Sequence, residues 1–182
     1  MADLGATLLR LARNAIAARF GAARAAVDDM PELRRPGATF VTLTQGGELR
    51  GCIGSLEAHQ PLIDDVQDNA CSAAFRDPRF APLREDELAR TRVEVSLLTA
   101  PQSFPVEDEA DARARLRPGV DGVIFSARGR RATFLPQVWE QLPDPGQFLA
   151  RLRQKAGLPA DYWGPDVRLE TYQVRKWKEE PP

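Results

Sequence analysis

The spacing of hydrophobic residues predicts a chain that mixes helices with strands. Near the N-terminus Leu4, Leu8 and Leu11 recur on one helix face, with arginines off that stripe. The predicted helices run over residues 3–26, 61–75, 107–116 and 147–156, with short helical turns at 85–89 and from Pro136.

Alternation of apolar and polar residues predicts two hairpins and two further strands. The predicted strands are 40–44 and 48–55, joined by Gly46-Gly47; 122–126 and 131–135, joined by Arg128-Gly129-Arg130; and the separate strands 93–98 and 167–177. Because both hairpins are antiparallel and helices lie among the strands, we expect an α+β fold with a mixed or antiparallel sheet and packed helices. The length of 182 residues suits one such domain over residues 1–182.

The strand after the first turn is unusual, because it places Arg50, Gly51, Cys52 and Gly54 within five residues. Alternation along a strand sends Arg50 and Cys52 to one face. A two-residue turn would set Val41 opposite Cys52, so that aliphatic side chains partly enclose the thiol. The glycines leave the backbone open to close approach by a ligand or a neighbouring chain.

Composition and charge restrict the function classes. Hydrophobic residues make up 43% of the chain and charged residues 28%, as in ordinary globular proteins. The net charge of −1 creates no field that attracts nucleic acid or an anionic membrane. The arginine-rich N-terminal helix resembles a mitochondrial transit peptide, but an ordinary amphipathic helix explains it without a further assumption. We therefore expect a cytoplasmic protein that binds neither nucleic acid nor membrane.

The two cysteines, Cys52 and Cys71, are too few for a disulfide scaffold or a self-contained zinc site, so we expect reduced thiols. Cys52 is a candidate nucleophile, because Arg50 on the same face would favour its thiolate. The alternative is a small buried hydrophobic residue, which Cys71, among alanines, is expected to be. His59 either folds back to activate the thiol or lies on the surface. The spacing indicates no metal site.

Four other polar residues are candidates for the same site. Asp77 and Arg79, in a proline-rich loop, either rigidify a turn or anchor an anion through Arg79. Glu94 lies on the polar face of strand 93–98, as a partner of Arg50 or as a general base. Gln137 could bring an amide to the same cleft. The candidate catalytic residues are Cys52, Glu94 and His59, and the candidate substrate-binding residues are Arg50, Gly51, Gly54, Asp77, Arg79 and Gln137.

Five stretches of the sequence are distinctive when taken in order. They are Leu49-Arg50-Gly51-Cys52-Ile53-Gly54, then Ala73 to Phe80, Val93 to Leu98, Phe134 to Trp139, and Lys155 to Leu158. Together they resemble the AMMECR domain family, with its LRGCIG hexapeptide, whose bacterial members are labelled AmmeMemoRadiSam system protein A. The resemblance implies an α+β fold with a sheet-containing main lobe and a smaller second lobe. It also implies the company of a Memo-type protein, related to extradiol dioxygenases, and of a radical S-adenosylmethionine enzyme.

Two functions fit these observations. One is an enzyme acting on a small anionic substrate, with Cys52 as nucleophile or acid/base, Arg50 holding charge, and Glu94 and His59 carrying protons. The other is a non-catalytic binding or adaptor module, in which the glycine-rich strand is a docking edge or presents a ligand to a partner enzyme. Under either function the resemblance implies cooperation with Memo-type and radical S-adenosylmethionine proteins. The reaction, the substrate and any cofactor stay open.

Overall fold

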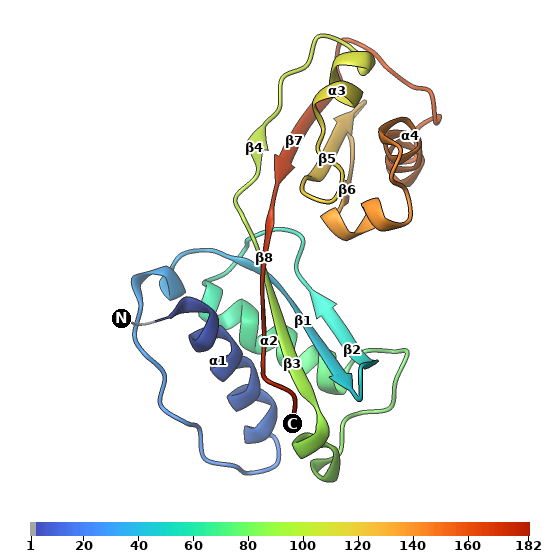
Figure 1. Ribbon diagram of the computed structural model, residues 1–182. Helices are drawn as coiled ribbons and strands as arrows, with labels where there is room; N and C mark the ends of the chain where they lie inside the picture. The colour runs from blue at the N-terminus through green and yellow to red at the C-terminus, as the bar shows by residue number, and fades with distance from the viewer. Residues whose placement is uncertain (1–2) are drawn as a thin grey trace. The chain divides into compact units, whose positions relative to one another are not determined.

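The computed structural model describes residues 3–182, which divide into two compact units (Figure 1). Residues 3–98 and 175–182 form the first unit, and residues 99–174 form the second. Each unit has a hydrophobic core of its own. The predicted α+β class is confirmed, with antiparallel strand pairs in both units. Whether the two units behave as one domain stays a prediction.

The first unit packs two helices on one face of a four-stranded sheet. The strands lie in the order β2-β1-β3-β8, and β1 is antiparallel to both of its neighbours. Leu8 of the first helix and Val66 of the second belong to the same buried cluster as Val41 of the sheet. The elements are α1 (Leu4–Ala18), the 3-10 helix η1 (Pro31–Arg34), β1 (Ala38–Gln45), β2 (Glu48–Gly54), α2 (Leu62–Phe75), the 3-10 helix η2 (Glu85–Arg90), β3 (Arg92–Leu98) and β8 (Val174–Lys178).

The first helix is shorter than predicted, because it ends at Ala18 and not near residue 26. Gly21 adopts a φ of 83°, a left-handed conformation that takes the chain off the helix axis. The following segment then runs back beside α1. There the Asn14 amide donates to the carbonyl of Ala25 at 2.7 Å, and its oxygen accepts from the Ala25 N–H at 3.1 Å. These two bonds replace the helical ones that the sequence pattern had suggested.

The first hairpin turns at Gly46-Gly47 as predicted, with φ values of 56° and 86° that suit a two-residue turn. The predicted register beyond it is wrong. Thr42, and not Val41, lies opposite Cys52, because the pairing shifts by one residue at Arg50. This β-bulge has a physical reason. Without it Arg50 would lie opposite Leu43, whose side chain is buried on the helix side of the sheet, so the charge of Arg50 would enter the core. The alternation that placed Arg50 and Cys52 on one face is therefore interrupted between them.

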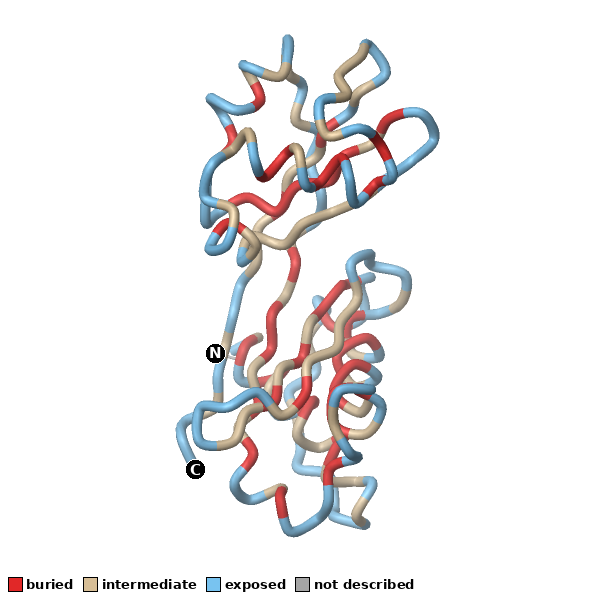
Figure 2. The backbone as a smooth tube through the Cα atoms, turned by 90° about the vertical axis from the view of Figure 1, so that its right-hand side faces the viewer, coloured by how far each residue is buried: buried red, intermediate tan, exposed pale blue. Residues whose placement is uncertain are grey.

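The second unit also builds a four-stranded sheet, in the order β4-β7-β5-β6. In its core Trp139 stacks on Phe148, with ring centroids 3.7 Å apart, and Phe125 of the central strand β5 belongs to the same buried cluster. Figure 2 shows how the buried residues concentrate on the helices and central strands of each unit, while the connecting loops are exposed. The elements are β4 (Gln102–Ser103), α3 (Glu109–Arg115), β5 (Gly122–Ala127), β6 (Arg130–Phe134), the 3-10 helix η3 (Pro136–Glu140), α4 (Pro145–Lys155) and β7 (Arg168–Tyr172).

The predicted final strand, residues 167–177, is two strands that belong to different sheets. Gln173 separates them. Its backbone N–H donates to the Thr99 hydroxyl at 2.8 Å, and its carbonyl accepts from the Thr99 N–H at 2.9 Å. The prediction failed because the apolar pattern continues across Gln173, while its hydrogen bonds go to a residue 74 positions away.

Candidate functional site

Cys52 lies on the face of the first sheet that points away from α1 and α2, which we call the outer face. Its thiol is 3.2 Å from the Thr42 hydroxyl on β1, directly opposite. Thr42 in turn lies opposite Glu94 on β3, and Lys178 on β8 contacts the Glu94 carboxylate at 3.0 Å. A thiol, a hydroxyl, a carboxylate and an ammonium group thus form one row across the four strands, hereafter the Cys52 row. Facing residues of neighbouring antiparallel strands lie about 5 Å apart.

The two glycines of the hexapeptide allow close packing on opposite faces of β2. A Cβ at Gly51 would lie 2.2 Å from the backbone carbonyl oxygen of Ala73 on α2. A Cβ at Gly54 would lie 2.2 Å from the ring of Phe40, which covers that position from β1. The close approach predicted at these glycines is therefore made by the protein itself, and their role in binding a substrate stays a prediction.

Arg50 is the extra residue of the bulge, and its guanidinium group contacts Glu87 on η2. Nε and one terminal nitrogen donate to the two carboxylate oxygens at 3.1 and 3.2 Å, in an ion pair whose side chains are only 13% and 10% exposed. These bonds from Arg50 are the main reason that the pKa of Glu87 falls to about 2. Arg50 also donates to the carbonyl of Ala81 at 2.9 Å. Its charge is compensated by Glu87, and the predicted partner, Glu94, pairs with Lys178 instead.

Asp77 and Arg79 hold the backbone of Cys52. The Cys52 N–H donates to Asp77 at 2.9 Å, and Arg79 donates to the Cys52 carbonyl at 3.3 Å. Arg79 also donates to both oxygens of Asp77, at 3.0 and 2.7 Å, and this pairing is the main reason that the pKa of Asp77 lies well below its usual value. Because β2 is an edge strand, the pair satisfies backbone groups that no neighbouring strand reaches. Asp77 is buried, whereas the Arg79 side chain is 54% exposed.

The other two candidates, His59 and Gln137, are both exposed. His59 is exposed in the loop after β2, where its Nδ1 lies 3.1 Å from the carbonyl oxygen of Glu57. Gln137 is exposed on η3 of the second unit. The catalytic role of His59 and the binding role of Gln137 therefore rest on the sequence alone and stay predictions.

Thr42 and Lys178 were missed at the sequence level, although both belong to the Cys52 row. The sequence held a weak signal for Lys178. The ring of Trp177 packs against Gly5 on α1, and because side chains alternate along a strand, Lys176 and Lys178 on either side of it lie on the outer face. Thr42 was missed because the register was predicted one residue out. No cluster of three metal-ligating side chains occurs among residues 3–182.

A second polar cluster, also missed, lies next to the site on the helix side of the sheet. Asp65 on α2 is fully buried, and it accepts bonds from the Thr39 N–H at 2.8 Å, the Thr39 hydroxyl at 2.7 Å and the Ser55 hydroxyl at 2.6 Å. Asn69, one turn later, donates to the Thr39 carbonyl at 3.1 Å. The sequence contained a signal for this cluster, because two polar residues, Asp65 and Asn69, lie on the buried side of α2. The cluster fixes the start of β1 to the end of β2.

The sequence and the fold are both similar to those of known proteins. The AMMECR1 family model matches residues 9–177. A protein of Methanothermobacter thermautotrophicus is 40% identical over 98% of this chain and 95% of its own length, and Protein MK0488 of Methanopyrus kandleri is 34% identical over 98% and 89%. The crystal structure of the uncharacterized protein PH0010 from Pyrococcus horikoshii superposes with a TM-score of 0.79 at 33% identity, covering 100% of this chain and 94% of that one. No helix of the described residues is long and apolar enough to cross a membrane.

Proposed function

The chain belongs to the AMMECR1 family, and from that premise we propose that the outer face around Cys52 binds a small anionic substrate on which the Cys52 thiol acts. One observation carries this proposal. Within the hexapeptide, packing accounts for Gly51, Ile53 and Gly54, an ion pair accounts for Arg50, and Leu49 is exposed. The Cys52 thiol has no such explanation, because it lies partly exposed on the face away from the core, beside a hydroxyl.

The Cys52 row supplies the groups that thiol chemistry requires. Loss of the thiol proton to the Thr42 oxygen, with Thr42 passing its own proton toward Glu94, leaves a nucleophilic thiolate. Lys178 is paired with Glu94, and Lys176, two residues before it, adds a further positive charge on the same face for an anionic substrate. Asp77 and Arg79 fix the backbone that carries the thiol, so the nucleophile is held in one position.

Alkylation of Cys52 tests this proposal. In a Cys71→Ala background, iodoacetamide labels only Cys52, and its second-order rate is measured at neutral pH. We expect Thr42→Val and Glu94→Gln each to slow labelling several-fold, because each interrupts the proton path. Glu48→Gln, an exposed carboxylate on the same strand as Cys52, is the matched control. Unchanged rates in both row variants would remove the proton path from the proposal.

A non-catalytic binding module is the second candidate, and a specific observation favours it. The thiol contacts a neutral hydroxyl, while the charges of Arg50 and Arg79 are already balanced by Glu87 and Asp77. Docking of another strand at the β2 edge is disfavoured at Cys52, since Asp77 and Arg79 occupy its backbone groups. A Cys52→Ser variant that is fully active in cells would support the binding module over the enzyme.

Cooperation with Memo-type and radical S-adenosylmethionine proteins is part of the same proposal, and it rests on the sequence resemblance. The cytoplasmic location is likewise a proposal, and it rests on the composition and charge of the chain. Titration of the purified chain with each partner by isothermal calorimetry is the direct test. Binding that Lys176→Glu and Lys178→Glu abolish together would make the outer face the contact surface, and absence of binding to either protein would remove the partnership.

A further inference from the structure

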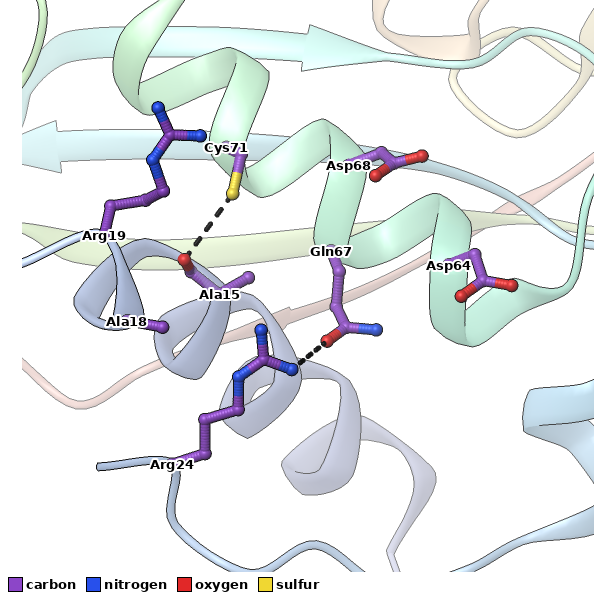
Figure 3. A pocket seen from close by; sticks show the side chains of 8 residues that line it. All are labelled: Ala15, Ala18, Arg19, Arg24, Asp64, Gln67, Asp68 and Cys71. Atoms are coloured by element: carbon purple, nitrogen blue, oxygen red, sulfur yellow. Dashed lines mark hydrogen bonds between the residues drawn. The ribbon is translucent and has the colours of Figure 1, made fainter. Parts of the chain in front are cut away.

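A pocket of about 460 Å³ lies between α1 and α2, on the helical side of the first unit. We call it the α1–α2 pocket. Figure 3 shows that Arg19 lies on one side of Cys71 and Asp68 on the other, with Gln67 between the helices. Its polar lining consists of Arg19, Arg24, Asp64, Gln67, Asp68 and Cys71. Pockets of about 300–1,000 Å³ are typical of small-molecule sites.

Opposite charges line this pocket, and three of the four charged groups contact neutral groups. The Arg19 guanidinium lies over the Phe75 ring, 5.2 Å from its centroid. Arg24 reaches the Gln67 amide oxygen at 3.4 Å, and Asp68 accepts from the Gln60 amide at 3.2 Å. Within the described chain, no ion pair joins either arginine to Asp64 or Asp68. The positive and the negative groups of the pocket therefore both remain available to a ligand.

The charged groups are not needed to hold the helices together. α1 and α2 meet through small and apolar side chains such as Ala12, Ala15 and Ala70, and the Cys71 thiol donates to the Ala15 carbonyl at 3.5 Å. Burial raises the pKa of Cys71, so its thiol stays neutral and adds apolar surface to the wall. The pocket is thus positive at the arginines, negative at the aspartates and neutral between them.

We propose that the α1–α2 pocket binds a small zwitterion of the basic amino acid class. The ligand carboxylate lies at Arg19 and Arg24, and its two cationic groups lie at Asp64 and Asp68. The two aspartates are four residues apart, a rise of about 6 Å along the helix, which the α- and ε-ammonium groups of lysine can span. A ligand with one charged group would satisfy only half of the pocket. The proposal concerns a different surface from the Cys52 row and does not depend on it.

The test is an NMR titration of the ¹⁵N-labelled full chain with L-lysine, using cadaverine and hexanoate as its cationic and anionic halves at matched ionic strength. We expect saturable amide shifts at Gln67 and Cys71 with lysine. Each half should bind at least about 3-fold more weakly, because each loses exposed ion pairs of modest strength. Shifts that do not saturate, or that are equally strong with cadaverine alone, would overturn the proposal.

Charge-removing variants provide the second part of the test. Asp68→Asn is expected to weaken lysine binding about 2- to 5-fold, the range for one exposed ion pair. Asp161→Asn, an exposed aspartate in the second unit, is the matched control and should bind lysine like the wild type. The amide spectrum of each variant reports whether it is folded. Unaltered lysine affinity in a folded Asp68→Asn variant would contradict the assignment.

Discussion

Each glycine of the Leu49–Gly54 stretch has a neighbour that a side chain would strike. At Gly51 the neighbour is the backbone of α2, and at Gly54 it is the ring of Phe40. The sequence could indicate that something approaches β2 closely, because glycine inside a strand often marks a close approach or a bulge. It could not show what approaches, because Ala73 comes from a helix whose docking depends on the whole core. For the same reason Glu87 could not be recognised as the partner of Arg50.

Gly51→Ala tests the packing explanation for the hexapeptide. The new methyl group would meet the Ala73 carbonyl oxygen, and neither backbone can shift cheaply, so we expect a loss of about 1–3 kcal/mol in the free energy of unfolding. Urea denaturation measures this loss. Gly164→Ala is the control, since its methyl group would meet only the far ends of the Tyr162 and Asp166 side chains. A Gly51→Ala protein as stable as the control would refute the contact.

The Arg50–Glu87 pair makes stability depend on pH in a defined direction. The pKa of Glu87 is lowered from 4.5 to about 2 in the folded state, so its contribution is fully present above about pH 4.5 and is lost as pH falls toward 2. We expect Glu87→Gln to lower the free energy of unfolding by about 2 kcal/mol at pH 7, and by clearly less at pH 3. Urea denaturation at the two pH values is the measurement. Glu85→Gln, an exposed carboxylate on η2, should show no such pH-dependent difference.

At the scale of elements, the predicted helices and hairpins exist, and the errors occur where hydrogen bonds to distant residues override the local pattern. α1 ends early because the Asn14 side chain forms two hydrogen bonds with the backbone of Ala25. The predicted last strand is divided into β7 and β8 because the backbone of Gln173 is hydrogen-bonded to Thr99. The register beyond the Gly46-Gly47 turn shifts because a bulge at Arg50 keeps a charge out of the core. The first two errors depend on hydrogen bonds between residues 11 and 74 positions apart, and the third depends on which side of the sheet is buried.

The buried Asp65 cluster is the clearest link between elements near the site. Removing the carboxylate leaves the N–H and hydroxyl of Thr39 and the hydroxyl of Ser55 without that acceptor. We therefore expect Asp65→Ala to cost about 3 kcal/mol of unfolding free energy and to speed hydrogen exchange at the Thr39 amide. Asp64→Ala, at the exposed neighbouring position, is the control. Thr39 exchange that stays as slow as in the control would refute the linkage.

At the scale of the whole molecule, the prediction is one domain with a main lobe and a small second lobe, and the structure contains two units with separate cores. The chain enters the second unit after Leu98 and leaves it at Val174, so the second unit is inserted between β3 and β8 of the first sheet. Pattern analysis could not reveal this insertion, because β7 and β8 read as one strand.

The single-domain prediction can be tested through cooperativity. If the chain is one domain, Asp65→Ala, which lies in the first unit, should also raise hydrogen exchange in the strand Gly122–Ala127 of the second unit. Hydrogen exchange monitored by mass spectrometry follows both units in one sample. Wild-type exchange rates in that strand of the variant would show that the two units unfold independently.

The central claim is that Cys52 is a reachable nucleophile on a face that attracts anions, and its selectivity between two alkylating reagents tests this most directly. In Cys71→Ala protein, the rate ratio of iodoacetate, an anion, to iodoacetamide, its neutral analogue, is measured for the native chain and for the chain in urea. Because Glu94 balances Lys178, the excess positive charge of this face comes from Lys176, which should raise the native ratio above the unfolded one. A Cys52 that reacts with neither reagent in the native state, or equal native and unfolded ratios, would contradict the account.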